Sequence, residues 1–491
     1  MKTLTIIGAV VAFAAACSND PVGNLNQLTP GFAPDAFNAR LGGVVYMQKF
    51  DFGTRINAMD SFARVAANFT ITDPRSITEW LGDGVAIENS TFYATSNWTN
   101  QFTAIRNAQS LLADLPKANP AYSAGDLAKF KGIVYTLEAL SYMYAAETKD
   151  TLGVPVQGPL VASTAPQPIL CSRNTWQFIV ALLDSGLTQL NVDNTPGLPG
   201  GLDAGFAAVA SQASPSTAAG SFAGFNRALA ARANLELAYA IARSPGGTPP
   251  TTTTAGSPDL TALTRADSAL HATFLYNTGA LAPPDSLGDF NDALAVYHLF
   301  SGQSGDIPNP LNGTITTYFL LNEAVDAMDP TDLRFTHKFK PNVGTAVTSY
   351  NIVASPLTLA MYATPASPIP IIRNEDLHLY GAQIRLGLND LAGAVSEINN
   401  VRTMVGHIAP VANPGTYTGV RDLILNEYIA SSTGEPSGNR VAAIRDYGLP
   451  AVTDTTWDNV ANQGPDTHAT VQPFPIADVT ARNGNTKYTC P

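Results

Sequence analysis

The chain has 491 residues and a formal net charge of −12, with 39 acidic and 27 basic side chains. This charge disfavours nucleic acid or an anionic lipid surface as a partner, because the sequence has no basic stripe to displace counterions from phosphate. Only 13% of the residues are charged, so the polar surface must come mostly from serine, threonine, asparagine, glutamine and glycine. Neutral ligands suit such a surface better.

The N-terminus has the pattern of a bacterial lipoprotein signal. Lys2 precedes an apolar stretch, residues 4–16, that is shorter than the roughly 20 residues a membrane span needs. Small residues then lead directly into Cys17, as in a lipobox. We therefore predict a signal peptide over residues 1–16, acylation of Cys17, and a flexible tether over residues 17–30. The alternative is a plain secretory signal that is cleaved before a cysteine.

Apolar residues recur at helical spacing in several segments, which predicts amphipathic helices. These segments are residues 98–115, 126–147, 176–190, 225–243, 377–384 and 391–405. A tight turn at residues 387–389 separates the last two, and Asp390 can cap the second, so we expect an antiparallel pair. Repeated helix pairs predict a mainly α fold, a tetratricopeptide-like helix-pair array with long irregular loops. No clean repeat with the usual signature is visible.

The segments between the helix pairs have the composition of loops. Residues 191–221 and 245–258 are rich in Gly, Pro, Ala, Ser and Thr, which predicts surface loops. Residues 302–317 and 342–367 mix β-branched residues with turn formers, which predicts a few short hairpins. A helical frame with loops of this length usually functions through the loops.

The cysteines indicate an oxidising compartment. If Cys17 is acylated, Cys171 and Cys490 remain as an even pair, and we predict that they form a disulfide. The alternative is two buried free thiols.

Several segments resemble a known family. Residues 369–403 resemble the shared block of SusD/RagB-type outer-membrane nutrient-uptake lipoproteins, and residues 98–112, 137–160, 329–335 and 473–485 resemble its other signatures. Within the shared block the matching residues are Arg373, Glu375, Asn399, Val401 and Arg402.

The late helix departs from the family pattern. The usual Asn/Asp-Glu-Arg triplet is Asn426-Glu427-Tyr428, and Glu435 is separated from its glycine. Arg440 and Arg445 are present, but alanines stand where an aspartate is expected. We interpret these residues as a structural lattice of ion pairs.

The resemblance implies a single helical domain over residues 31–491, held at the outer membrane and exposed on the cell surface. Such a protein would bind an oligosaccharide or a peptide and deliver it to a TonB-dependent β-barrel transporter of the SusC type. The family performs no catalysis and needs no cofactor, so the resemblance predicts a binding protein and not an enzyme.

Two other classes stay open. A glycan hydrolase needs a pair of carboxylates, and the sequence points to no particular two. The six histidines are scattered without metal-ligand spacing, no EF-hand spacing supports a calcium site, and we predict no metal. A self-assembling structural or adhesive scaffold is compatible with the helical array.

Sugar binding requires aromatic rings and amide or carboxylate groups on accessible loops. Two regions have this composition, and Trp98 and Trp176 belong instead to helical stripes that predict core positions. The candidate ligand-binding residues are Trp80, Asp83, Phe92 and Tyr93 in the first region, and Tyr297, Phe300, Gln303, Tyr318 and Tyr350 in the second.

Overall fold

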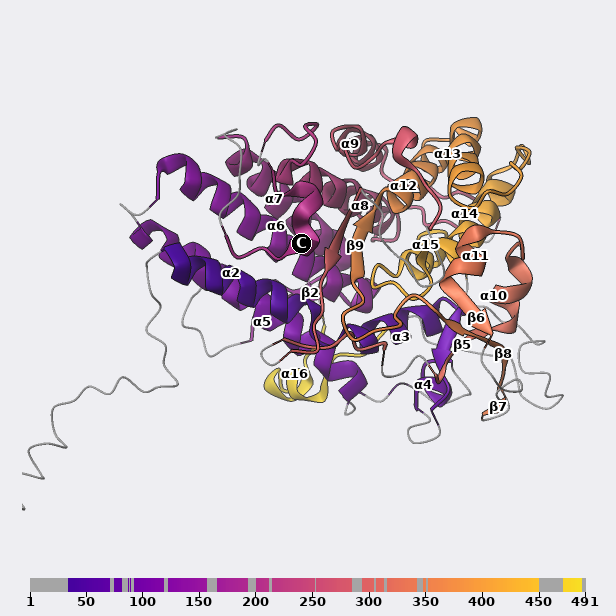
Figure 1. Cartoon of the computed structure of the whole chain (residues 1–491), viewed down its shortest axis with the longest axis horizontal. Helices are drawn as coiled ribbons and strands as arrows, with labels where there is room; N and C mark the ends of the chain where they lie inside the picture. Colours follow the sequence, from indigo (N-terminus) through magenta and orange to yellow (C-terminus); the bar gives the residue numbers. More distant parts are fainter. Residues whose placement is uncertain are drawn as a thin grey trace, which may run out of the picture.

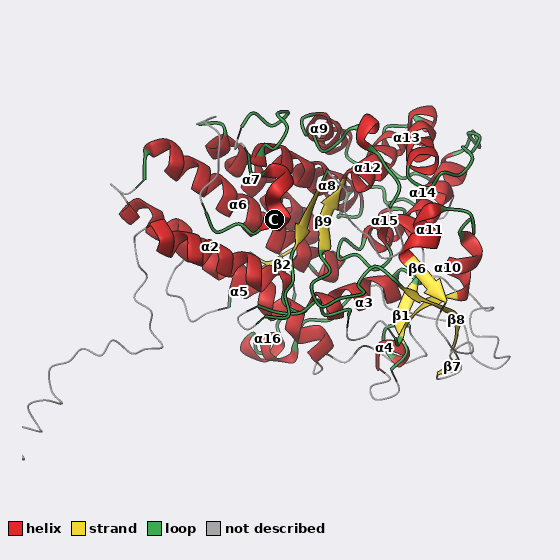
Figure 2. Cartoon of the chain, viewed as in Figure 1, coloured by secondary structure: helices red, strands yellow, loops and turns green. Residues whose placement is uncertain are grey.

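Helices make up most of the described part of the chain, as the apolar periodicity predicts, and the strands are short (Figure 2). The structure is a computed structural model. It describes residues 34–70, 75–81, 87, 89, 92–118, 122–156, 166–192, 200–211, 214–251, 253–284, 294–303, 306–312, 316–341, 348–349, 352–449 and 471–487. The predicted boundaries after residues 16 and 30 lie outside this part and stay predictions.

The helices pack as consecutive pairs. Their bounds are α2 (Pro34–Lys49), α3 (Phe52–Phe62), α4 (Arg75–Thr78), α5 (Phe92–Asp114), α6 (Ala124–Lys149), α7 (Ser172–Leu190), α8 (Phe222–Ala242), α9 (Leu260–His271), α10 (Asn322–Ala327), α11 (Leu333–Lys338), α12 (Asn374–Gly387), α13 (Leu391–Met404), α14 (Tyr417–Ser432), α15 (Asn439–Asp446) and α16 (Ile476–Ala481). Packing joins α5 with α6, α6 with α7, α7 with α8, α8 with α9, and α12 with α13 (Figure 1). The predicted mainly α array of helix pairs is confirmed.

The turn between α12 and α13 forms as predicted. Asn389 has a positive φ of 63°, which reverses the chain after α12. The carboxylate of Asp390 accepts a hydrogen bond from the backbone N–H of Gly393 at 2.8 Å and so caps α13. α12 also packs on α8, α9 and α14, so it connects the N-terminal helices to the C-terminal ones.

In the described part of the chain the strands form one sheet of five strands and two sheets of two strands. Their bounds are β1 (Ala66–Asn68), β2 (Val154–Pro155), β3 (Ile169–Leu170), β4 (Ala295–His298), β5 (Tyr318–Leu321), β6 (Phe339–Pro341), β7 (Thr348–Ser349), β8 (Ile352–Leu359) and β9 (Ile369–Arg373). The largest sheet has the order β1-β5-β8-β6, with β7 also paired to β8, while β2 pairs with β3 and β4 with β9. All these pairs are antiparallel.

Of the two regions predicted to contain hairpins, one contains a hairpin. β7 and the start of β8 form a hairpin within residues 342–367, with Thr348 opposite Val353. The described residues of 302–317 contain no strand, because the strands lie just before and after this segment as β4 and β5. These two strands pair with other partners, β9 and β1.

The prediction of a surface loop over residues 191–221 was wrong in part. Residues 204–209 form a 3₁₀ helix, η3 (Ala204–Val209), in which Phe206 and Val209 are fully buried. The ring of Phe206 packs against Phe222 and Phe225 at the start of α8, with centroids 6.3 and 6.0 Å away. Apolar anchors therefore pull part of this Gly- and Ala-rich segment into the core.

Gly153 lies just after α6, where the backbone comes so close to Leu170 that only glycine fits. Its φ is 73°, and a Cβ atom there would lie 1.8 Å from the carbonyl oxygen of Leu170. We expect Gly153→Ala to lower the free energy of unfolding by about 1–3 kcal/mol, measured by chemical denaturation. Gly246→Ala is the matched control, because its φ is 85° but nothing lies within 4 Å of its Cβ position. Equal losses in the two variants would contradict the predicted clash.

The interpretation of the late helix as part of an ion-pair lattice is confirmed for Glu427 and Glu435. Glu427 pairs with Arg334 at 2.7 Å, and Glu435 pairs with Arg373 at 2.7 Å and with Lys338 at 3.0 Å. All five side chains are buried. These contacts tie α11, β9 and the end of α14 together.

Arg440 and Arg445 serve the lattice differently. Both guanidinium groups donate to backbone carbonyl oxygens, Arg440 to Ala63 and Arg445 to Glu147. Asp446, the residue after Arg445, is buried, and its carboxylate accepts a hydrogen bond from Arg243 at 2.8 Å.

Candidate binding site

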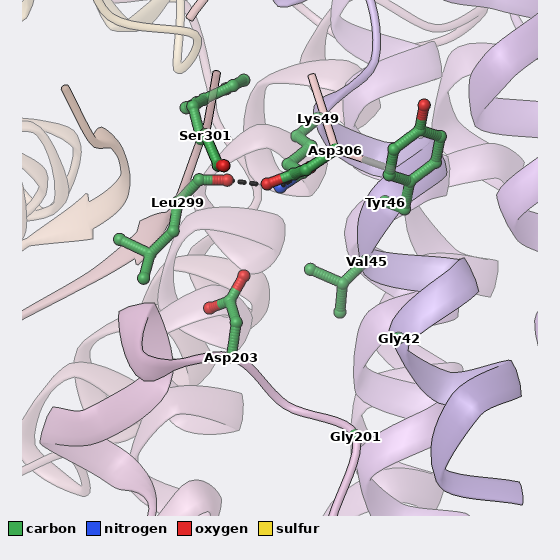
Figure 3. Close-up of a pocket in the computed structure, with 10 residues that line it drawn as sticks. Gly42, Val45, Tyr46, Lys49, Gly201, Asp203, Leu299, Ser301 and Asp306 are labelled. Carbon is green, nitrogen blue, oxygen red and sulfur yellow. Dashed lines mark hydrogen bonds and ion pairs between the residues drawn. The ribbon is translucent and has the colours of Figure 1, made fainter. Parts of the chain in front are cut away.

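A pocket of about 370 Å³ opens between α2, the chain before η3, and the chain after β4 (Figure 3). α2 forms one wall, and residues around Asp203 and Leu299 face it from the other side. The lining residues are Gly42, Val45, Tyr46, Lys49, Gly201, Asp203, Leu299, Phe300, Ser301 and Asp306. This volume lies near the lower end of the roughly 300–1,000 Å³ of small-molecule sites.

Two aromatic rings lie at the C-terminal end of the α2 wall. Tyr46 and Phe50 are four residues apart, so their side chains lie on one face of the helix end. Their ring centroids are 5.9 Å apart with an interplanar angle of 51°. Phe50 is 38% exposed, whereas Leu41 and Val44 on the opposite face of α2 are buried. The rim of the pocket therefore carries exposed aromatic surface.

Lys49 closes one end of the pocket. Its ammonium forms an ion pair with Asp306 at 2.8 Å and donates a hydrogen bond to the carbonyl oxygen of Leu299. It also lies 5.3 Å from the centroid of the Phe300 ring, within the range of a cation–π interaction. The side chain of Lys49 is only 6% exposed, so the ammonium is held in place by these three partners.

Asp203 supplies a carboxylate opposite α2. It caps η3, since one carboxylate oxygen accepts a hydrogen bond from the backbone N–H of Gly205 at 2.9 Å. Burial raises the pKa of Asp203, and Asp306 adds to this effect, while the Gly205 hydrogen bond and the Lys49 charge oppose it. The carboxylate is half-buried and remains in contact with the pocket.

The first predicted ligand-binding region does not line this pocket. Trp80 is fully buried, with its ring 6.4 Å from that of Phe62, so its prediction as a ligand contact was wrong. Asp83 lies outside the described residues. Phe92 and Tyr93 belong to the first turn of α5, and their side chains lie outside the described part.

The second predicted region is divided between the core and the pocket. Tyr318 is fully buried, and its hydroxyl donates to Asp60 at 2.5 Å, so it is a core residue and not a ligand contact. Phe300 lines the pocket, and Tyr297 is buried two residues before Leu299. Gln303 is exposed, and its backbone N–H donates to the Ser301 hydroxyl. Tyr350 lies outside the described residues.

Several pocket residues were not predicted from the sequence. Tyr46, Lys49, Asp203 and Asp306 come from segments without a strong motif. The four-residue spacing of Tyr46 and Phe50 was the one sequence pattern that could have pointed to the aromatic residues of α2. It could show that the two rings share a helix face, but not that the face is open.

Of the three cysteines in the lipidation and disulfide predictions, only Cys171 lies in the described part of the chain. Cys171 precedes α7 and is disulfide-bonded. Cys490 and Cys17 lie outside the described residues, so the pairing of Cys171 with Cys490 and the acylation of Cys17 stay predictions.

The described residues also bear on metals and membranes. In the ranges that the structure describes, no group of three or more His, Cys, Asp or Glu side chains is placed to hold a metal ion. Among the same residues no helix combines the length and the apolar character that a membrane crossing requires.

Comparison with known proteins identifies the fold. No protein-family model matches the sequence, and no curated protein matches it. A SusD superfamily protein from Bacteroides thetaiotaomicron superposes with a TM-score of 0.67 at 16% identity, covering 92% of this chain and 98% of that one. A SusD-like carbohydrate binding protein from Bacteroides vulgatus gives 0.65 at 12% identity, covering 93% and 98%. A SusD superfamily protein from Bacteroides fragilis gives 0.62 at 15% identity, covering 92% and 98%.

The described part of the chain is therefore built mainly of packed helix pairs, with most of its strands and two short helices between α9 and α12. Its fold is that of the SusD superfamily, which confirms the resemblance recognised in residues 369–403.

Proposed function

We propose that this protein binds an oligosaccharide on the outside of the cell and delivers it to a TonB-dependent outer-membrane transporter. The observation that carries the proposal is the pocket beside α2, whose lining includes the aromatic residues Tyr46 and Phe300 and the carboxylates of Asp203 and Asp306. The fold supports it, since one solved structure of the same fold is a SusD-like carbohydrate binding protein.

The pocket has the chemistry that sugar binding needs. The C–H faces of a pyranose ring pack on aromatic rings such as Tyr46, and the sugar hydroxyls need acceptors and donors nearby. Asp203 offers carboxylate lone pairs, and Ser301 offers a hydroxyl. These contacts hold a ligand without changing a covalent bond.

Lipid anchoring belongs to the same proposal. An acylated Cys17 would hold the protein at the outer membrane, and the low proportion of charged residues leaves a polar but weakly charged surface for neutral nutrients. The partner would be a SusC-like β-barrel that receives the ligand. This assignment rests on the lipobox and the family resemblance.

A glycan hydrolase has less support than a binding protein. Asp203 and Asp306 share the pocket, but Asp203 caps η3 and Asp306 is paired to Lys49. The Lys49 ammonium opposes the use of Asp306 as a proton donor, and Asp203 is held in place as the cap of η3. Release of reducing ends from polysaccharides by the purified protein would favour the hydrolase.

The binding proposal is tested with Tyr46→Ala. The purified protein should bind at least one glycan of a neutral oligosaccharide panel, measured by calorimetry. The variant should weaken this affinity about three- to tenfold, because ring stacking is worth about 0.5–1.5 kcal/mol. Uptake of the same glycan by intact cells should fall in parallel if capture precedes import.

Tyr135→Ala is the control for this test, because Tyr135 is a half-buried tyrosine on α6 that does not line the pocket. It should leave glycan affinity unchanged. Absence of glycan binding by folded wild-type protein, or equal affinity of wild type and Tyr46→Ala, would contradict the proposal.

A further inference from the structure

The charges of the pocket limit which sugars it can hold. Its described lining contains two carboxylates, Asp203 and Asp306, and one ammonium, that of Lys49. The sum of these formal charges is negative. A ligand that enters therefore meets an excess of hydrogen-bond acceptors and negative charge.

The Lys49 ammonium, the one ammonium in the described lining, already has partners. Lys49 is paired with Asp306 at 2.8 Å, donates to the Leu299 carbonyl oxygen and lies over the Phe300 ring. An ammonium has three donors, so these partners occupy most of its capacity. Turning it toward a ligand anion would leave the Asp306 carboxylate and the Leu299 carbonyl without their donor, at the cost of desolvated polar groups.

Asp203 makes an anion in the pocket still less favourable. Burial raises the pKa of Asp203 because a charged carboxylate loses solvation in this space, and a ligand anion would lose solvation there in the same way. A hydroxyl group, in contrast, can donate a hydrogen bond to the Asp203 oxygens without adding charge. Uncharged ligands are therefore favoured at this wall.

On the basis of the proposed function, we propose that the pocket accepts the end of an uncharged oligosaccharide and rejects acidic sugars such as uronates, because the Lys49 ammonium, the one ammonium among the described lining residues, is neutralised by Asp306. The volume of about 370 Å³ suits a short terminal portion of a glycan and not a long chain lying along a groove. Lys49 thus acts as a structural cation of the pocket wall.

The test compares neutral and acidic trisaccharides on the full-length protein. The neutral probes are maltotriose, cellotriose, mannotriose and xylotriose, and the acidic probe is trigalacturonate, all measured by calorimetry in low-salt buffer. At least one neutral probe should bind about tenfold or more tightly than trigalacturonate. Added salt should narrow this ratio, because screening weakens charge repulsion.

The variant Asp306→Asn tests the role of the ion pair. It frees the Lys49 ammonium and removes one negative charge, and Asp306 is 31% exposed, so the fold should tolerate the change. The affinity ratio of neutral to acidic probe should fall about fivefold or more. The control Asp326→Asn removes an exposed carboxylate from α10 and should leave the ratio unchanged.

The outcomes separate the two proposals. Preference for trigalacturonate in the wild type, with an affinity that Tyr46→Ala weakens, would overturn the specificity and leave the binding function standing. An unchanged ratio in Asp306→Asn would also overturn the role of the neutralised ammonium. Failure of every probe, neutral or acidic, to bind the folded protein would overturn the proposed function together with the specificity.

Discussion

Replacing Arg334 by methionine should lower the free energy of unfolding by about 3–5 kcal/mol. The guanidinium of Arg334 is buried on α11 and forms ion pairs with Asp332 at 2.6 Å and with Glu427 at 2.7 Å. Glu375 lies 3.5 Å away. Methionine would fill part of the volume but leave these carboxylates buried without their central cation.

The electrostatic reason is visible at Glu375. Burial raises the pKa of this carboxyl, but Arg373 and Arg334 outweigh the effect and lower the pKa to about 2. Without Arg334 the charged form of Glu375 loses one of its two main partners. The protein must then hold buried carboxylates with less positive charge beside them or take up a proton, and both cost stability.

Chemical denaturation at neutral pH measures this prediction, with Arg265→Met as the control. Arg265 is exposed on α9, so its replacement should change the free energy of unfolding by less than about 0.5 kcal/mol. If Arg334→Met were as stable as the control, the buried lattice would contribute little to the fold. A variant that fails to accumulate as folded protein, beside a well-folded control, agrees with the prediction.

The second large effect concerns acid stability and His298. This side chain is fully buried on β4, with its ring 5.0 Å from Phe52, and both ring nitrogens lack a hydrogen-bond partner in the part of the chain that the structure describes. Burial lowers the pKa of His298 to about 3, and the nearby Lys49 charge adds to this effect. The folded state therefore holds the neutral imidazole.

The direction of the pH dependence follows from proton uptake. The unfolded chain binds a proton at His298 near the ordinary pKa of 6.5, whereas the folded chain does so only near 3. Stability from this group is complete above pH 6.5 and is lost as the pH falls toward 3, by about 1.4 kcal/mol for each pH unit. Between pH 6.5 and pH 4.5 the loss should reach about 2–3 kcal/mol.

His298→Phe isolates this contribution. Phenylalanine fits a position lined by Phe52 and Tyr144 and cannot take up a proton. Denaturation at pH 7 and pH 4.5 should show that the variant loses about 2–3 kcal/mol less stability than the wild type. His271→Phe, at an exposed position on α9, should behave as the wild type. Identical losses in His298→Phe and the wild type would contradict the neutral, buried state of His298.

Other buried groups change how the free energy of unfolding depends on pH, but they do not change the difference between the wild type and His298→Phe. Burial raises the pKa of Asp60 and of Asp376 to about 7. Their folded forms keep a proton that the unfolded chain has lost, so these two groups favour folding as the pH falls below 7. Since both are present in every variant, the difference between wild type and His298→Phe still reports on His298.

The helical frame was predictable because its signal is local. The stripes at residues 98–115, 126–147 and 176–190 became α5, α6 and α7, and the predicted core positions of Trp98 and Trp176 are confirmed at 7% and 2% exposure. A helix places residues three and four apart on one face whatever the rest of the chain does. The Asp390 cap and the turn before it are local for the same reason.

The family resemblance added the lattice that periodicity cannot show. Glu427 and Glu435 were recognisable from their order along the chain, and their arginine partners Arg334 and Arg373 lie in two other signature segments. The pairing itself depends on distant segments meeting. Order along the sequence predicted the members, and the tertiary structure decided which charge meets which.

The sequence by itself determined the positions of the long helices, the antiparallel turn after α12 and the mainly α class of the fold, because each follows from spacing within a short segment. Only the tertiary structure decided that Trp80 and Tyr318 are core residues while Tyr46 and Phe300 border a pocket. An aromatic ring next to a loop has the same local pattern in both settings. The exposure of the ring depends on which distant segments pack beside it. The ion pair of Lys49 with Asp306, for example, joins the segment of Tyr46 to the segment of Phe300.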